Sequence, residues 1–244
     1  MTTARASDRT PSAEEFRAYR GKLWRIVEAQ HRISTNRLAT GADDQVLLEQ
    51  LVEEVKPVLP AAARHLHYLL ATPFRYGHKS GSRFRRAGEK PGIFYAAESV
   101  ATALAETAYW RLRFHSRSPG FRPPSVTVEH SAISVTVAVE RLLDLCASPY
   151  DEAAALWMDP DDYSACRIFA AEARAIDTQA IRYASVRDSR HRANVALFDP
   201  AVFRDPAPRN AQTWHFRFEH GELTAFGAFP SKERLHFRPS DFGL

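Results

Sequence analysis

The chain has 244 residues, of which 45% are hydrophobic and 25% are charged, so it can bury one substantial core and is expected to form one globular unit. Its 33 Lys and Arg against 29 Asp and Glu give a net charge of +4, a mild excess that is compatible with an anionic ligand or an acidic partner and does not single out a nucleic-acid binder. The two cysteines form neither a disulfide framework nor a zinc motif, and no apolar run has the length of a membrane span or the position of a signal peptide, so we expect a cytoplasmic protein without a membrane segment.

The N-terminal residues are expected to form a polar tail and then a short helix. Residues 1–11 are small and polar, which favours disorder. Ser12 stands three residues before Glu15, which is the spacing of a capping box, and apolar residues continue at helical spacing until Gly21 interrupts them. The pattern therefore predicts a helix that ends at about Tyr19.

Two amphipathic helices are expected next, at residues 43–55 and 60–70. The first has acidic residues in its first turn and ends before a proline, and the second has a proline at its start. Together with the first helix, they would make residues 12–72 a helical region ahead of a core formed by residues 73–244.

The most informative stretch of the core is a basic loop followed by a short strand and a helix. The loop is Gly81–Arg86, the strand is Ile93–Tyr95, and the helix has Ser99 as its expected N-cap. Glu106 in this helix is a carboxylate on a rigid element, and such a layout suits an anionic ligand that develops positive charge during a reaction. Each piece also has a plainer interpretation, which is a solvated basic loop, a core tyrosine and a partly exposed helix carboxylate.

The rest of the chain alternates strands and helices without a regular βαβ order, which predicts the α+β class. Residues 125–129 and 134–139 alternate at period two and are expected to pair with each other. Helices are expected at 151–157 and 161–176, and further strands at 181–187, 193–198, 212–219 and 222–228.

Several reaction classes find no support in the sequence. The ten histidines are scattered and include no pair at helical spacing, so no metal site is predicted. The motifs of serine hydrolases, P-loop NTPases and Rossmann dinucleotide-binding proteins do not occur.

The basic loop with Arg83, the helix with Glu106 and the segment Ile181–Asp188 with Ser185 resemble, in this order, the RES domain. This domain is named for an arginine, a glutamate and a serine, and it is the toxin of RES-Xre toxin-antitoxin pairs. The similarity covers residues 22–228. It implies a single domain with a mixed or antiparallel β core like that of ADP-ribosyltransferases, flanked by helices, with an opening strand at 22–27.

The resemblance implies that the substrate is NAD+, with no other cofactor. Members of the family cleave the bond between nicotinamide and ribose, and they deplete NAD+ by hydrolysis or phosphorolysis or transfer its ADP-ribose. Glu106 would stabilise the ribosyl cation, Ser185 would bind the ribose or carboxamide side, and Arg83 would bind the pyrophosphate with either Arg25 or Arg75. The further substrate-binding candidates are Tyr95, which would stack on nicotinamide or flank the ribose, Tyr76 and Arg187.

Two other functions stay open at this point, and the partners follow from the resemblance. A mono-ADP-ribosyltransferase that modifies a specific bacterial protein would use the same site, and a non-enzymatic basic binding protein would keep only the fold. A toxin in the bacterial cytoplasm implies an Xre-type antitoxin whose terminal segment blocks the arginine-lined cleft. A homodimer is left open, and direct binding of nucleic acid is not expected.

Overall fold

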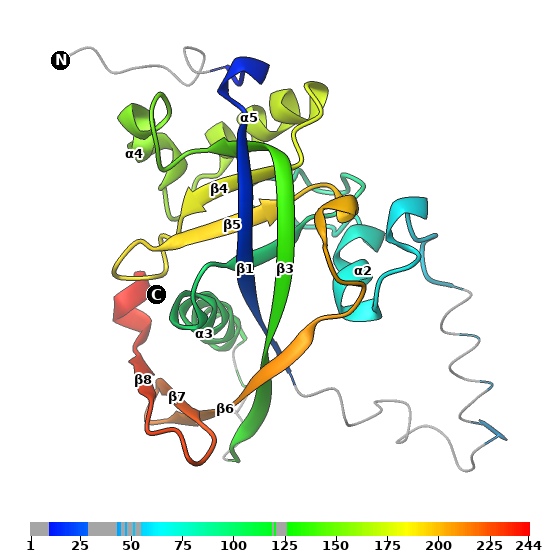
Figure 1. The fold of residues 1–244 in the computed structure, drawn as a ribbon. Coiled ribbons are helices and arrows are strands. Elements are labelled where there is room, and N and C mark those ends of the chain that lie inside the picture. Colours follow the sequence, from blue (N-terminus) through cyan, green and yellow to red (C-terminus); the bar gives the residue numbers. More distant parts are fainter. Residues whose placement is uncertain are drawn as a thin grey trace.

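The computed structural model describes residues 10–28, 43–44, 47, 51, 55–118, 120 and 126–244 (Figure 1). Most of the predicted tail at 1–11 and most of the predicted helix at 43–55 lie outside these residues. Among the residues that are described, no helix is both long enough and apolar enough to cross a membrane.

Eight strands of the described chain form one sheet in the order β1-β2-β5-β4-β3-β6-β7-β8. The strands are β1 (Arg17–Glu28), β2 (Phe94–Ala97), β3 (Val128–Asp144), β4 (Ala180–Ala184), β5 (Ala193–Leu197), β6 (Arg209–Glu219), β7 (Glu222–Gly227) and β8 (Arg234–Phe237). The α-helices are α2 (Tyr68–Arg75), α3 (Val100–Ser116), α4 (Ala154–Trp157) and α5 (Ser164–Ala175). The pair β3–β4 is parallel and the other pairs are antiparallel, so the predicted α+β class with a mixed sheet is confirmed.

The strands β1, β2, β5, β4 and β3 close into a ring, because β1 also pairs with β3 along its length. Figure 1 shows these two long strands side by side, with α3 and α2 on opposite sides of them. One hydrophobic cluster combines side chains from all five strands with those of α2. A second cluster packs α4 and α5 against β3, β4 and β5, and a third packs α3 against β6 and β7.

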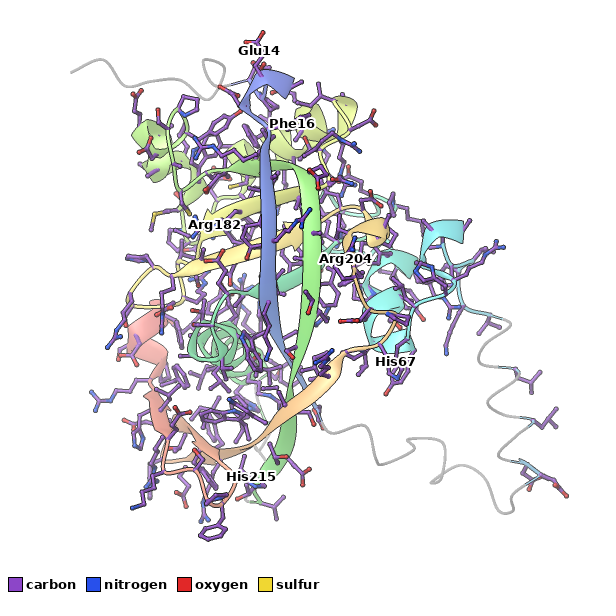
Figure 2. The ribbon with its side chains drawn as sticks, viewed as in Figure 1. Glu14, Phe16, His67, Arg182, Arg204 and His215 are labelled. Carbon is purple, nitrogen blue, oxygen red and sulfur yellow. The ribbon has the colours of Figure 1, made fainter. Side chains whose placement is uncertain are left out.

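An ionic cluster joins β1, β3 and β4 to Glu98, the residue that follows β2. Arg182 on β4, labelled in Figure 2, binds Glu98 through Nε at 2.8 Å and Asp144 through Nη1 at 3.3 Å. Tyr19 on β1 donates its hydroxyl to Glu98 at 3.1 Å. Burial and the adjacent Glu98 carboxylate raise the pKa of Tyr19, so its hydroxyl stays protonated and can donate.

The N-terminal helix predicted to about Tyr19 is wrong. The capping box of Ser12 and Glu15 is present, but it starts a 3-10 helix of three residues, Ala13–Glu15, and β1 begins at Arg17. Eleven residues of β1, polar and apolar, pair with β3, so long-range pairing outweighs a local helical pattern. The tyrosine ring of Tyr19 lies over Gly21, where a Cβ would come within 2.6 Å of the tyrosine oxygen, which explains a glycine inside a strand.

The two strands predicted at 125–129 and 134–139 do not pair with each other. Residues 128–144 form the single strand β3, which pairs with β1 along one edge and with β6 along the other. The residues between the two predicted strands include neither Gly nor Pro, so the alternation continues through them. The helix predicted at 60–70 is also displaced, since the chain forms a 3-10 helix at Ala61–Ala63 and then α2.

Candidate active site

A cavity of about 280 Å³ opens where β1 and β2 separate. The two strands pair at Trp24 and Ala97. Beyond this pair they no longer bond to each other, and Arg25 on β1 and Tyr95 on β2 line the cavity instead. The separation of these two strands thus opens the cavity next to α3. The sequence pattern did not indicate this position.

Glu106 reaches this cavity from α3. The helix begins as predicted at Ser99, whose hydroxyl accepts the backbone N–H of Thr102 at 3.1 Å. The Oε1 atom of Glu106 accepts two hydrogen bonds of 2.7 Å, one from the hydroxyl of Ser185 and one from the side-chain amide of Asn194. In the described part of the chain, Oε2 has no hydrogen-bond partner. One carboxylate oxygen is therefore fixed and the other is available to a ligand.

Ser185 lies in a buried turn that follows β4. Its Oγ accepts the backbone N–H groups of Arg187 at 3.2 Å and Asp188 at 3.1 Å, so its hydroxyl hydrogen is directed to Glu106. Asp188 in turn accepts hydrogen bonds from Thr102 on α3 at 2.7 Å and from Arg192 at 2.6 Å. Burial alone would raise the pKa of Asp188, but the hydrogen bonds from Arg192 and Thr102 outweigh it and lower the pKa.

The basic loop is folded onto the protein, which rules out the solvated loop of the plainer interpretation. Arg83 is 7% exposed and Arg85 is 4% exposed. The hydroxyl of Tyr95 holds the loop against β2, because it contacts Ser82 Oγ at 2.8 Å and accepts the backbone N–H of Phe84 at 3.2 Å. Burial raises the pKa of Tyr95, so the hydroxyl remains neutral.

Arg83 and Arg187 both line the cavity, and one segment at residues 157–163 contacts them both. Arg83 donates through Nη1 to the carbonyl of Trp157 at 2.6 Å, and its guanidinium lies 4.3 Å from the ring centre of Tyr163. Arg187 donates through Nη2 to the carbonyl of Pro160 and, at 3.2 Å, to the hydroxyl of Tyr163. Its guanidinium also stacks on the ring of Tyr109 at 3.6 Å.

The two arginines that the sequence left as alternatives lie in different places. Arg25 lines the cavity, with its guanidinium 4.9 Å from the ring centre of Phe94. Its Nη1 is buried and has no hydrogen-bond partner within the described ranges, and burial lowers its pKa to about 10, so it is still a cation at neutral pH. Arg75 and Tyr76 lie at the end of α2, and neither lines the cavity.

The structure thus brings together Arg25, Arg83, Tyr95, Glu106 and Arg187 around one cavity, with Ser185 behind the glutamate. Sequence reasoning missed Asn194 and the contacts of Tyr163. A buried asparagine inside the apolar strand β5 was a usable signal for the first, since a buried amide needs a polar partner. The described residues contain no group of three or more His, Cys, Asp or Glu side chains that could hold a metal ion.

Comparison with known proteins gives one family match. A family model described as the RES domain matches residues 59–219, which is more than half of the chain and includes Arg83, Glu106 and Ser185. Among solved structures, a chain in the crystal structure of the M. tuberculosis MbcT-MbcA toxin-antitoxin complex is similar, with 15% sequence identity and a TM-score of 0.44 over 81% of this chain and 84% of that chain. No curated protein matches the sequence.

Proposed function

This chain belongs to the RES domain family, and we propose that it is a toxin that acts as an enzyme on NAD+. It cleaves the bond between nicotinamide and ribose and depletes NAD+ by hydrolysis or phosphorolysis. The observation that carries this proposal is the carboxylate of Glu106, which is fixed through one oxygen, has its other oxygen without a protein partner in the described chain, and shares a cavity with three arginines.

Glu106 supplies the catalytic charge. When nicotinamide leaves, the ribose carries positive charge that is absent from the substrate's ribose, and a nearby carboxylate stabilises this charge in the transition state. Ser185 and Asn194 hold the carboxylate in place before the reaction, so no reorganisation is needed during it. The unbound Oε2 is the oxygen that faces the ribosyl cation or orients the incoming water or phosphate.

The arginines bind the pyrophosphate of NAD+. Each phosphate carries a negative charge, and guanidinium groups bind phosphate oxygens through charge-assisted and often bidentate hydrogen bonds. We assign this role to Arg83 together with Arg25, since Arg25 lines the cavity and Arg75 does not. The ring of Tyr95 flanks the ribose or the nicotinamide, while its hydroxyl keeps the basic loop in position.

The test is NAD+ turnover by the purified protein, with and without phosphate, followed by mass spectrometry of the products. We expect nicotinamide release that Glu106→Gln abolishes, with ADP-ribose as the product of hydrolysis and its phosphorylated form as the product of phosphorolysis. Transfer of label from NAD+ to a protein in a cell lysate, without free ADP-ribose, would instead identify a mono-ADP-ribosyltransferase. Absence of both turnover and NAD+ binding would leave the non-enzymatic binding protein.

A toxin of this kind requires an inhibitor in the cell, and we propose an Xre-type antitoxin as its partner. Because the substrate is NAD+, the site of action is the bacterial cytoplasm. Expression of the chain alone should arrest growth and lower cellular NAD+, and the Glu106→Gln variant should do neither. Growth arrest that persists in the Glu106→Gln variant would mean that the toxicity does not come from this site.

A further inference from the structure

Two buried arginines of the cavity have no acidic partner. Arg83 and Arg187 are 7% and 6% exposed, and within the described residues neither forms an ion pair with a carboxylate. A buried charge without a counterion is costly unless something else compensates it. Among the residues that line the cavity, Glu106 is the single carboxylate, and its fixed oxygen is occupied by Ser185 and Asn194. Within the described ranges, no carboxylate therefore pairs directly with either arginine.

Acidic residues in the segment that contacts both arginines form hydrogen bonds within their own loop. The segment between Trp157 and Tyr163 contains three aspartates. Asp159 accepts the backbone N–H groups of Asp161 at 2.8 Å and Asp162 at 2.7 Å, and Asp162 accepts the backbone N–H of Ser164 at 2.8 Å. These bonds stabilise the turn before α5, and they leave the two arginines to be held by uncharged groups.

Each arginine is held by one terminal nitrogen only. Arg83 uses Nη1 for the carbonyl of Trp157 and a contact with the Cys166 sulfur, and Arg187 uses Nη2 for the carbonyl of Pro160 and the hydroxyl of Tyr163. In the part of the chain that is described, Nε and the second terminal nitrogen of both arginines have no hydrogen-bond partner. In Arg83 the remaining donors Nε and Nη2 share one edge, which can bind two oxygens of one phosphate. In Arg187 the remaining donors Nε and Nη1 lie on different sides of the guanidinium, so each can give a single hydrogen bond.

Among the described residues, Tyr163 is the side chain that contacts both guanidinium groups. Its ring lies against Arg83 at 4.3 Å, and its hydroxyl accepts a hydrogen bond from Arg187 at 3.2 Å. Both contacts favour the cation without neutralising it, because a ring face and a phenol oxygen carry only partial negative charge. Tyr163 therefore links two arginines that lie far apart in the sequence and keeps both charges available.

From this geometry we infer that Tyr163 is a positioning residue that holds Arg83 and Arg187 as a paired site for a diphosphate. The inference rests on the proposed function and deepens it, since it adds Arg187 to the pyrophosphate site and names the residue that sets the geometry of the pair. The ligand class is a molecule with two linked phosphates, as in ADP-ribose, in which Arg83 and Arg187 each bind one phosphate.

The experiment compares the binding of two probes by calorimetry, ADP-ribose with its diphosphate and nicotinamide riboside without phosphate. Tyr163→Phe keeps the ring under Arg83 and removes the bond to Arg187, so we expect ADP-ribose to bind about threefold more weakly. Tyr163→Leu removes both contacts, and we expect about a tenfold loss. Binding of nicotinamide riboside should remain the same in both variants, because it makes no use of the pair.

Tyr150→Phe is the matched control, because Tyr150 is a buried tyrosine that does not line the cavity, and its ADP-ribose affinity should equal that of the wild type. A folded Tyr163→Leu variant that binds ADP-ribose as tightly as the wild type would overturn the inference. An equal loss for both probes would also overturn it, since it would show a general disturbance of the cavity. If the wild type binds ADP-ribose and the graded loss is found while NAD+ is not turned over, the inference holds and the proposed enzymatic function fails.

Discussion

The two walls of the cavity fix their charged groups in different ways. On one wall, Glu106 projects from a long helix and is held by Ser185, in a turn, and Asn194, in a strand. On the other wall, Arg83 and Arg187 come from loops, and the segment 157–163 holds them through two carbonyl oxygens and Tyr163. Arg187 also stacks on Tyr109 of α3. The group proposed for the chemical step thus stands on a helix, whereas Arg83 and Arg187, two of the groups proposed for binding, stand on loops.

The two walls also share one physical principle. Neutral groups hold Glu106, Arg83 and Arg187, and in the described part of the chain none of these three forms an ion pair. A charge held in this way is oriented and still free to act on a ligand, and such preorganised charge is worth more in an enclosed site than in water. We therefore expect changes near Glu106 to lower the rate of the reaction and changes near the arginines to lower the affinity for the ligand.

The largest expected effect is that of Glu106→Gln. This variant removes the charge and nearly keeps the shape, so we expect the single-turnover rate of NAD+ cleavage to fall by about 100- to 1000-fold. Affinity for ADP-ribose should change by less than about threefold, because the carboxylate acts mainly in the transition state. Rapid-quench kinetics and calorimetry measure the two quantities. A similar loss in rate and in affinity would contradict the assignment of catalysis to one wall of the cavity and of binding to the other.

The next effect is on stability. It concerns the contact between α3 and the turn after β4 that contains Ser185. Asp188→Asn removes a buried carboxylate that accepts charge-assisted bonds from Arg192, and we expect the free energy of unfolding to fall by about 1.5 to 3 kcal/mol at neutral pH. The folded state lowers the pKa of Asp188, so its contribution is present above the unfolded pKa of about 3.9 and is lost as the pH falls through the folded value.

Urea unfolding at neutral and acidic pH tests this prediction. The control is Asp161→Asn. Asp161 is exposed in the segment between Trp157 and Tyr163, and its substitution should change stability by less than about 0.5 kcal/mol. Equal destabilisation by both variants would mean that Asp188 does not hold the turn of Ser185 against α3.

A smaller effect on the rate is expected at Asn194. Asn194→Leu removes one of the two donors to Glu106 Oε1, and we expect kcat to fall by about tenfold with little change in KM. Asn194→Asp should be more damaging, because it replaces the donor with a second negative charge beside the glutamate. Steady-state kinetics would contradict the assignment if Asn194→Asp were as active as the wild type, or if the loss appeared in KM.

The smallest expected effect concerns the far end of α3, where Arg111 binds Glu28 at 2.8 Å and lies 2.6 Å from Nε2 of His130. Burial, followed by the charge of Arg111, lowers the pKa of His130 to about 4. His130 is therefore neutral in the folded protein at a pH where the unfolded chain already takes up a proton. Its contribution to stability is complete above the unfolded pKa of about 6.5 and is lost as the pH falls towards about 4.

The melting temperature of the wild type should thus fall between about pH 6.5 and pH 4 more steeply than that of His130→Asn, which has no proton to bind at this position. His65→Asn, at an exposed histidine, should keep the wild-type slope. Identical slopes for wild type and His130→Asn would show that this end of α3 is not pH-sensitive.

The sequence by itself determined the α+β class, the beginning of α3 at Ser99 and the presence of Glu106 on a rigid helix. It also determined the order of the arginine, glutamate and serine motifs along the chain, which the family match supports. The fold class and the helix depend on capping and periodicity, which act between residues that are close in the chain. The order of the three motifs came from the resemblance to the RES domain.

The resemblance implied an opening strand at 22–27, but only the tertiary structure decided that this strand begins at Arg17. It alone also decided that Arg83 is buried and that Asn194 and Tyr163 contact the charged groups of the cavity. Each of these outcomes depends on contacts between residues far apart in the chain, such as the pairing of β1 with β3. The cavity itself lies where β1 and β2 stop pairing, and a local pattern does not show where two strands separate. Long-range strand pairing and burial therefore determine the position of the site, because they bring side chains together that are distant in the sequence.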